Sequence, residues 1–382
     1  MLKKYLIAPG PTPVPERVLL EMAKPVIHHR TSEFEAIFGK VAEGLKAVFN
    51  TKQDVLMLAG SGTAAMEAAV INTLNPGDSV LVVDAGKFGQ RWRDICKTYG
   101  INVSSIELDW GRSVKAEMIE EFLSANPETK AVLMQGSETS TTAYHPVEDI
   151  AKVVSKRDNC LFIVDGITSI GVHETKFDEW GIDIAVTGSQ KAFMLPPGLS
   201  FICLSEKAWR FAESSTIPKY YLNLKKELKS QSKNTTAYTP ATTLISGLAE
   251  VLKMFMEEGL ENVYKRHAVN AEATRAAITA MGFELLAEVP SNAATGFYLP
   301  ESIDGGKLVK FMREKVGITY AGGQDHLKGR IVRVSHLGYH DAFDTITAIS
   351  GLEMGLRNMG YDLKLGTGVA AAEEVLQSYI GE

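Results

Sequence analysis

The sequence predicts an α/β protein with a large, mainly parallel seven-stranded sheet and a smaller C-terminal α+β domain. Apolar runs of strand length recur through the first two-thirds of the 382 residues, and helical patterns separate most of them. Such alternation is typical of a parallel sheet with helices on both faces. After about residue 255 the order of elements changes. We therefore expect an N-terminal arm and large domain in residues 1–255 and a small domain in residues 256–382.

The first expected element is a helix over residues 33–49, where Phe34, Phe38, Val41 and Leu45 recur at helical spacing. It precedes every strand, whereas a plain dinucleotide-binding domain begins with its strand. Helical patterns such as MIEEFL and VEDIAKVVSK separate the later strands, and a helix over residues 243–257 should join the two domains. The strands are expected near residues 55–59, 80–83, 103–108, 131–135, 161–165, 183–187 and 200–204.

The C-terminal part has a mixed pattern of helices and strands. After His267 it predicts a helix (AEATRAAITAMG), strands (FELLAE and TGFYLP) and another helix (GKLVKFMREKVG). Two further strands (ITYAGG and IVRVSH) and two helices complete the chain. This order predicts a compact α+β unit after the large domain.

Composition excludes several classes of protein. The net charge is −6 and no large basic block is present, so we expect no nucleic-acid partner. The three cysteines show no metal or redox spacing, which fits a reducing compartment. No run reaches transmembrane length, and the N-terminus lacks the apolar core of a signal peptide. We therefore expect a cytoplasmic protein without a membrane partner.

A single lysine, Lys191, stands in the segment IDIAVTGSQKAFMLPPG, residues 182–198. An apolar run of strand length precedes it and Pro-Pro-Gly follows, so the backbone is restricted on both sides of the lysine. Burial lowers the pKa of an amine, and an uncharged amine attacks carbonyl groups. Lys191 is therefore a candidate for Schiff-base chemistry. The alternative is a loop lysine whose amine reaches solvent.

An aspartate, Asp165, ends the apolar run that begins at Leu161. Ligands of open α/β sheets bind at the carboxyl ends of strands, so Asp165 and Lys191 should emerge at one edge of the sheet. A lysine that forms an imine and an aspartate that keeps a ring nitrogen protonated are the groups that pyridoxal phosphate requires. The alternative for Asp165 is a helix cap or a turn.

The segment VLMLAGSGTAAMEAAV, residues 55–70, reads as a strand, a Gly-Ser-Gly-Thr loop and a helix. Loop N–H groups and the helix dipole favour an anion, and Ser61 and Thr63 add hydroxyl donors. Residues 60–65 also obey the dinucleotide-binding pattern G-x-G-x-x-A, and Asp84 ends the next expected strand. The loop therefore predicts a phosphate site and leaves the cofactor open.

Together, the Gly-Ser-Gly-Thr loop, Asp165 and Lys191 resemble the class V aminotransferases, which have the type I fold of pyridoxal-phosphate-dependent transferases. The chain looks most like the alanine–glyoxylate and serine–glyoxylate aminotransferases, and the similarity covers nearly all of it. The segments that carry the resemblance are APGPTPVP at residues 8–15, AGSGTAAMEAAV, GKFGQRW, SETST, IVDGITSIG, GSQKAFMLPPG, TAYTPATTLISGL and IVRVSHLG.

The resemblance implies a role for each matching position around the cofactor. Lys191 would bind pyridoxal phosphate covalently, and Asp165 would pair with its pyridine nitrogen. An aromatic residue would stack on one face of the ring, an aliphatic residue would pack on the other, and a hydroxyl would contact its polar edge. These three positions are Phe88, Ile167 and Thr139, and the phosphate would be held by Ser61, Gly62, Thr63 and Gln190.

The resemblance also implies a substrate site and a second subunit. Arg333 matches the arginine that holds the substrate carboxylate, and Gly10, in the Pro-Gly-Pro opening, is expected in the substrate site. Thr236 and Thr239 fall in the segment that reaches the phosphate of a neighbouring subunit in relatives, so a homodimer is expected.

Two positions depart from the family pattern. Relatives often have glycine where this chain has Thr142, so the loop after Thr139 is expected to have a different shape. The stacking position is often tryptophan, and Phe88 offers a smaller face. Both departures concern the substrate more than the cofactor.

The expected activity is transamination between a small 2-amino acid (alanine or serine) and a 2-oxo acid (glyoxylate or pyruvate). The alternatives are lyase or desulfurase chemistry, an aminoethylphosphonate or ureidoglycine substrate, an NAD-dependent oxidoreductase, or a non-catalytic subunit. A desulfurase needs a cysteine on a loop, but the cysteines fall in helix- or strand-like runs. The cysteines are Cys96, Cys160 and Cys203.

His336 and His340 have the spacing of a zinc-binding helix but lie at a strand end, so we expect no metal.

Overall fold

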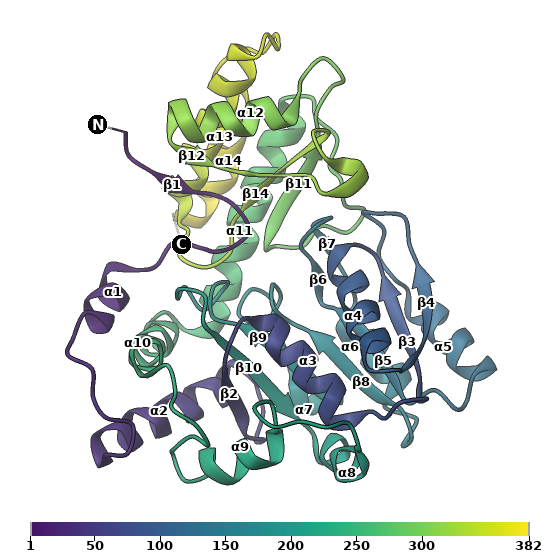
Figure 1. Cartoon of the computed structure of the whole chain (residues 1–382). Coiled ribbons are helices and arrows are strands. Elements are labelled where there is room, and N and C mark those ends of the chain that lie inside the picture. The colour runs from purple at the N-terminus through teal and green to yellow at the C-terminus, as the bar shows by residue number, and fades with distance from the viewer. Residues whose placement is uncertain (1, 381–382) are drawn as a thin grey trace.

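The computed structural model describes residues 2–380 and has two parts. Figure 1 shows a larger part built around one sheet and a smaller part formed mainly by the last third of the chain. Strand β1 (Tyr5–Leu6), near the N-terminus, lies in the smaller part, where it pairs in parallel with β12 (Ile318–Thr319). The arm that follows β1 crosses to the larger part, where α1 (Glu16–Met22) packs beside α10 (Thr242–Glu258).

The predicted seven-stranded, mainly parallel sheet is confirmed. Its strand order is β2-β10-β9-β8-β5-β3-β4, and only β10 runs antiparallel to its neighbours. Each predicted strand range agrees with the structure to within one residue at either end. The strands are β2 (Val55–Ala59), β3 (Ser79–Asp84), β4 (Asn102–Glu107), β5 (Ala131–Gln135), β8 (Leu161–Asp165), β9 (Ile184–Gly188) and β10 (Leu199–Leu204).

Helices cover both faces of this sheet, which is why its central strands are apolar except near their carboxyl ends. One core, with Phe38 and Phe162, lies under α2, α5, α6 and α10, and the other, with Met66 and Trp92, lies under α3, α4 and α8. The helices are α2 (Ser32–Phe49), α3 (Gly62–Thr73), α4 (Lys87–Thr98), α5 (Ala116–Ala125), α6 (Val147–Val154), α7 (Phe177–Trp180), α8 (Glu206–Ser214) and α9 (Leu224–Gln231).

The smaller part packs its helices around a three-stranded sheet of order β11-β14-β13. Its core joins Ile278, Phe297, Leu308 and Leu352 from four of its elements. A short hairpin of β6 (Ser137–Glu138) and β7 (Ala143–Tyr144) lies in the larger part. The elements of the smaller part are α11 (Leu260–Ala280), β11 (Ala294–Tyr298), α12 (Gly305–Phe311), β13 (Ala321–Gly322), β14 (Ile331–Ser335), α13 (Ala342–Asn358) and α14 (Thr367–Ile380).

Two predicted strands of the smaller part are corrected. The segment FELLAE forms only an isolated bridge, between Leu285 and Phe297. It leaves the ladder there because Glu288 N donates to Gly111 O of the larger part, 2.9 Å away. The segment ITYAGG is two short strands: β12 pairs with the N-terminal β1, whereas β13 pairs with β14. Neither change could be seen in the alternation of side chains, because both depend on distant partners.

Candidate active site

The carboxyl ends of β5, β8 and β9 lie side by side at one edge of the central sheet. Gln135 is paired with Asp165, and Asp165 with Val186, just before the loop that carries Lys191. The structure therefore brings Asp165 and Lys191 to the same edge, as the strand order along the chain predicts.

No helix among residues 2–380 combines the length and apolar character needed to cross a membrane.

Lys191 is held in a closed site, and only 9% of its surface is exposed. Its Nζ donates to Pro9 O of the N-terminal arm at 2.5 Å, and its own carbonyl accepts from Thr12 Oγ1 at 2.9 Å. Burial lowers the pKa of Lys191 to about 8, against the opposing effect of the nearby Asp165 charge. Burial therefore shifts this amine toward its uncharged state, in which it acts as a nucleophile or base.

Gly10 lies directly against this amine. A Cβ atom on Gly10 would stand 2.2 Å from Lys191 Nζ, and the φ of 110° at Gly10 is one that glycine adopts more easily than other residues. The arm thus reaches Lys191 because this position carries no side chain.

Asp165 is a buried carboxyl group without a cationic partner. Its Oδ1 accepts from Ile167 N at 2.9 Å, and it makes no ion pair in the described part of the chain. Burial raises the pKa of Asp165 to about 7, while the charges of Arg91 and Lys191 act in the opposite direction. An added cation at this carboxylate would therefore be strongly stabilised.

The N-terminus of α3 lies beside these two groups. Gly62 packs so closely on Ile167 that a Cβ would stand 2.4 Å from Ile167 Cδ1. Ser61 is the N-cap residue but its side chain caps nothing, and Gln190 Oε1 is buried without a hydrogen-bond partner. A Cβ on Gly188 would lie 3.2 Å from Gln190 Oε1 and 3.4 Å from Gly62 N. The unused N-terminus of α3 therefore faces a region that suits an anion, and Gln190 could add to it by turning its amide N–H groups toward that region.

Arg91 of α4 is a residue that the sequence analysis missed. Its Nη1 donates to Thr63 Oγ1 at 3.1 Å, and its guanidinium lies 4.7 Å from the centre of the Phe88 ring. It is close enough to influence the pKa values of both Asp165 and Lys191. The signal was available, because Phe88 and Arg91 are three residues apart on one helix within GKFGQRW.

Arg333 of β14 is a buried guanidinium with no carboxylate partner among the described residues. It donates to Gly322 O from Nε and Nη2, at 3.1 and 2.7 Å, and to Thr139 O from Nη1 at 2.7 Å. Burial lowers the pKa of Arg333 to about 10. Thr139 Oγ1 in turn lies 2.8 Å from the hydroxyl of Thr168, which sequence reasoning also missed. The arrangement leaves a buried cation ready for an added carboxylate.

Thr236 and Thr239 are the two predicted residues that lie apart from this cluster. They line a different cavity, of about 20 Å³, with Met57 and Leu199 among its other residues. Thr236 Oγ1 donates to Tyr238 O at 2.6 Å within its own segment. Within one chain, these threonines thus lie outside the group formed around Lys191.

The geometry does not support two of the alternative hypotheses, a dinucleotide-binding site and a desulfurase. Asp84, which a dinucleotide site would need for ribose, is bound by Arg93 Nη1 at 2.6 Å. The cysteines lie on α4, on β10 and directly before β8, and all are buried. Burial raises the pKa of Cys96 and of Cys160 to about 12, so neither is a reactive loop thiol.

Residues 2–380 contain no group of three or more His, Cys, Asp or Glu side chains that could hold a metal ion. Thr142 has a φ of 59°, in the left-handed region that favours glycine. Its hydroxyl accepts from Gly296 N at 3.1 Å, a bond that a glycine at position 142 could not make.

Comparison with known proteins gives one family over most of the length. The sequence matches the family described as aminotransferase class-V over residues 4–342. A protein of Synechococcus sp. (strain PCC 6716), named soluble hydrogenase, small subunit, is 41% identical over 98% of this chain and 99% of its own. The serine–glyoxylate aminotransferase of Methylorubrum extorquens is 36% identical over 98% of this chain and 96% of its own.

A solved structure has the same fold over its full length. The ureidoglycine–glyoxylate aminotransferase of Bacillus subtilis superimposes with a TM-score of 0.94 at 30% identity, and the match covers 99% of both chains.

Proposed function

We propose that this chain, which belongs to the class V aminotransferase family, transfers the amino group of alanine or serine to glyoxylate or pyruvate. The observation that carries the proposal is a group of three buried ionisable side chains, Lys191, Asp165 and Arg333, none of which has an ion-pair partner among residues 2–380. Burying unpaired charges is costly, so a non-catalytic subunit would gain nothing from them. The relatives' shared acceptor, glyoxylate, supports a small 2-oxo acid.

Class V aminotransferases depend on pyridoxal phosphate, which is therefore the cofactor of this chain. The residues present fit it: Asp165 has no ion-pair partner among residues 2–380, burial lowers the pKa of the Lys191 amine, and the N-terminus of α3 has no side-chain cap. Asp165 would hold the protonated ring nitrogen, Lys191 the aldehyde carbon, and Ser61, Gly62, Thr63 and Gln190 the phosphate. Phe88 and Ile167 would cover the two ring faces.

The chain's own residues supply binding and proton transfer. When bound, pyridoxal phosphate provides an aldehyde that takes up the amino group and a ring that withdraws electrons from the α-carbon. Arg333 binds the substrate carboxylate through two parallel hydrogen bonds and so fixes the α-carbon near Lys191. Lys191 Nζ removes the α-proton, a positioned transfer that contributes ~10²–10⁴-fold. Asp165 keeps the ring nitrogen protonated throughout.

The proposed function is tested by the visible absorption spectrum of the cofactor-loaded protein. Adding alanine or serine should change the spectrum, and adding glyoxylate or pyruvate afterwards should restore it. If neither amino acid changes the spectrum while ureidoglycine or aminoethylphosphonate does, the donor is wrong but the cofactor chemistry stands. A loaded protein that responds to no amino donor would refute transamination.

Replacing Arg333 with lysine should weaken the use of every α-amino acid. Lysine cannot form the two parallel bonds that a guanidinium makes with a carboxylate. A charged hydrogen bond contributes about 1.5–3 kcal/mol, so we expect kcat/KM for alanine and glyoxylate to fall by roughly 10- to 150-fold. Steady-state kinetics of both half-reactions would measure this. Arg330→Lys, an exposed position on the same segment, is the matched control, and equal kinetics for the two variants would remove Arg333 from the substrate site.

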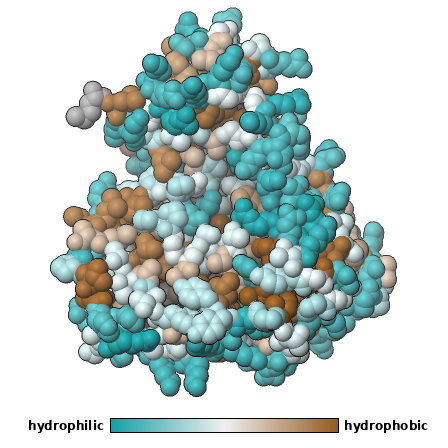
Figure 2. All heavy atoms as spheres, in the orientation of Figure 1, coloured by the Kyte–Doolittle hydropathy of each residue, from teal (hydrophilic) through white to brown (hydrophobic). Residues whose placement is uncertain are grey.

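We further propose that the chain works as a homodimer whose subunits exchange Thr236 and Thr239. Apolar side chains on α1 and after it are exposed, with Leu19 at 50%, Leu20 at 71% and Val26 at 74%. Figure 2 shows brown, hydrophobic residues at the left edge of the molecule, where Figure 1 has α1. Isolated apolar residues are normal on a surface, but a group of them marks a candidate interface.

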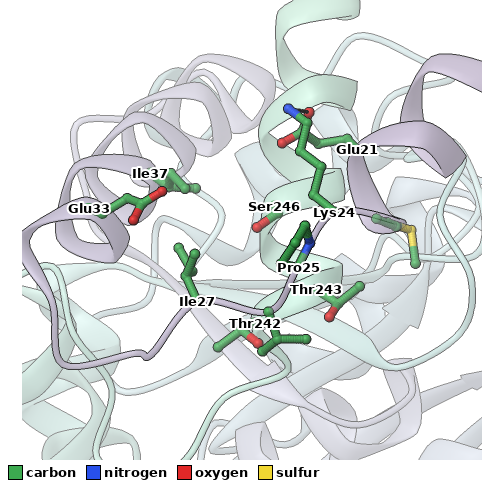
Figure 3. A pocket seen from close by; sticks show the side chains of 11 residues that line it. Glu21, Lys24, Pro25, Ile27, Glu33, Ile37, Thr242, Thr243 and Ser246 are labelled. Carbon is green, nitrogen blue, oxygen red and sulfur yellow. Dashed lines mark ion pairs between the residues drawn. The ribbon is translucent and has the colours of Figure 1, made fainter.

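A cavity of about 320 Å³ continues this apolar surface (Figure 3). It is lined by Pro25, Ile27 and Ile37 and by Thr242 and Thr243 of α10. The segment with Thr236 and Thr239 leads directly into α10, so the threonines and the apolar surface would meet the same partner. No residue of the Lys191 cluster lines the cavity, so it supports an interface rather than a second catalytic site.

Pyridoxal phosphate should stabilise the dimer. If two subunits together form its binding site, the cofactor binds the dimer more tightly than the monomer and shifts the equilibrium toward the dimer. Light scattering with and without the cofactor measures this. We expect Leu20→Asp to weaken the dimer and the cofactor to restore part of it, whereas Leu365→Asp, exposed far along the chain, should change nothing. A cofactor-loaded, fully active monomer would contradict the proposal.

A further inference from the structure

Glu138 is a fully buried carboxylate that the proposed chemistry leaves without a role. None of its surface is exposed, and it makes no ion pair within the described residues. It ends the short strand β6, within SETST, and is followed directly by Thr139. A buried carboxylate without a counter-charge is costly unless other donors satisfy it.

Four donors satisfy this carboxylate. Oε2 accepts from the main-chain N–H groups of Phe88 and Gly89, at 3.0 and 3.1 Å. Oε1 accepts from Ser140 N at 3.1 Å and from Ser140 Oγ at 2.5 Å. Ser140 Oγ also accepts from Lys87 N at 3.0 Å. Three consecutive N–H groups at the start of α4 are therefore bound by side chains of the SETST segment.

Helix α4 needs this external cap. The first N–H groups of a helix have no partner within it, and the N-cap residue here is Gly86, which has no side chain to offer. A Cβ on Gly86 would stand 2.6 Å from Glu138 Cγ and Cδ, so the glycine leaves the space that the carboxylate fills. Burial raises the pKa of Glu138, whereas the hydrogen bonds from Ser140, Gly89 and Phe88 and the positive end of the helix dipole favour the charged form.

The cap acts on the residue that would stack on the cofactor. Phe88 is the second residue of α4, and its N–H is one of the groups that Glu138 binds. Arg91 lies over the same ring from one turn further along the helix. Glu138 thus fixes the backbone of the first turn of α4 and with it the point from which the Phe88 side chain extends, while Arg91 packs on the ring.

We propose that Glu138 is a positioning residue, whose buried carboxylate fixes the first turn of α4 so that the Phe88 ring is held in place to stack on the cofactor. The inference rests on the proposed function, because it takes Phe88 as the stacking residue. The same segment also contacts the proposed substrate-binding residue, because the carbonyl oxygen of Thr139, the next residue, accepts a hydrogen bond from Arg333. One short segment thereby sets both the cofactor face and the carboxylate-binding arginine.

Glu353 offers a matched control for a purely structural cap. It is a glutamate on α13, 2% exposed, whose carboxylate accepts from Gly366 N at 2.7 Å and from Gly368 N at 2.6 Å, at the start of α14. Like Glu138 it caps a helix from another segment, but no contact links it to the Lys191 cluster within residues 2–380. Glu138→Gln and Glu353→Gln remove the same charge and leave the same shape.

The experiment compares cofactor binding by the two variants. Titration of the apoprotein with pyridoxal phosphate should give a Kd about tenfold higher for Glu138→Gln, which corresponds to ~1.4 kcal/mol. The visible circular dichroism of the bound cofactor should also weaken, since the ring loses its fixed stacking partner. Glu353→Gln should lose thermal stability but keep the wild-type Kd and visible signal. If Glu138→Gln and Glu353→Gln bind pyridoxal phosphate with the same Kd, Glu138 is only a structural cap.

A double-mutant cycle tests the link to Phe88 itself. If Glu138 acts through the ring, Glu138→Gln should change the Kd by less than about twofold once Phe88→Leu has removed the ring. Additive effects would overturn the proposal. Should Glu138→Gln fail to fold, Ser140→Ala, which removes one donor and the cap of Lys87 N, must raise the Kd in the same direction. Wild-type protein that binds no pyridoxal phosphate would refute the proposed function instead.

Discussion

Replacing Lys191 with alanine should lower the rate of transamination by about 10⁴-fold, the upper end of what a positioned general base contributes. On the proposed function, the variant would lose both the covalent attachment point and the group that moves the α-proton. Pyridoxal phosphate should still bind non-covalently through the N-terminus of α3 and Asp165. Single-turnover kinetics with alanine, together with a cofactor titration, would separate the two effects.

Lys219 is the matched control for this variant. Burial lowers its pKa too, but its amine is bound by Ile71 O at 2.9 Å and by Ser215, at the opposite end of α3 from Gly62. Lys219→Ala should therefore keep its activity per folded molecule. Lys191→Ala protein that turns over alanine at a rate near that of the wild type would show that another amine is the base.

Replacing Asp165 with asparagine should have the second largest effect. The carboxylate is buried, and the amide would leave the ring nitrogen without its counter-charge. Removing one partner of a buried ion pair costs about 3–5 kcal/mol, so we expect kcat to fall by roughly 10²–10⁴-fold. Steady-state kinetics at saturating cofactor would show the fall in kcat, and a cofactor titration would show weaker binding.

Asp183 is the control for a buried aspartate. It stands just before β9, at the other end of that strand from the site, and Lys207 Nζ lies 3.0 Å from its Oδ2. Asp183→Asn should reduce stability, because it breaks this pair, and leave kcat unchanged. An Asp165→Asn enzyme with wild-type kcat would mean that the ring nitrogen has a different partner.

The positions of the central strands can be predicted from the sequence because each strand has its own local pattern of apolar residues. Strands such as Leu161–Asp165 are buried on both faces, so each is a continuous apolar run that ends where the sheet ends. The same ends place Asp165 and the Lys191 loop at one edge. The strand order therefore predicts that the two residues lie close together, whereas the roles proposed for them also rest on the Gly-Ser-Gly-Thr loop and on the family resemblance.

The parts that sequence reasoning missed depend on contacts between distant segments. Glu138 and Phe88 are 50 positions apart, and nothing in either motif shows that the carboxylate binds the N–H groups of α4. Arg91 gains its place from Thr63 on α3, and FELLAE leaves its ladder for the carbonyl of Gly111. Each of these is a hydrogen bond whose partner the local pattern does not specify.

The most direct test of the central claim is to locate the covalent bond between cofactor and protein. Treating the loaded protein with borohydride makes that bond permanent, and peptide mapping by mass spectrometry then identifies the labelled residue. We predict a single label on Lys191, in the peptide that contains GSQKAFMLPPG. A label on a different lysine, or no label with pyridoxal phosphate in excess, would contradict the account.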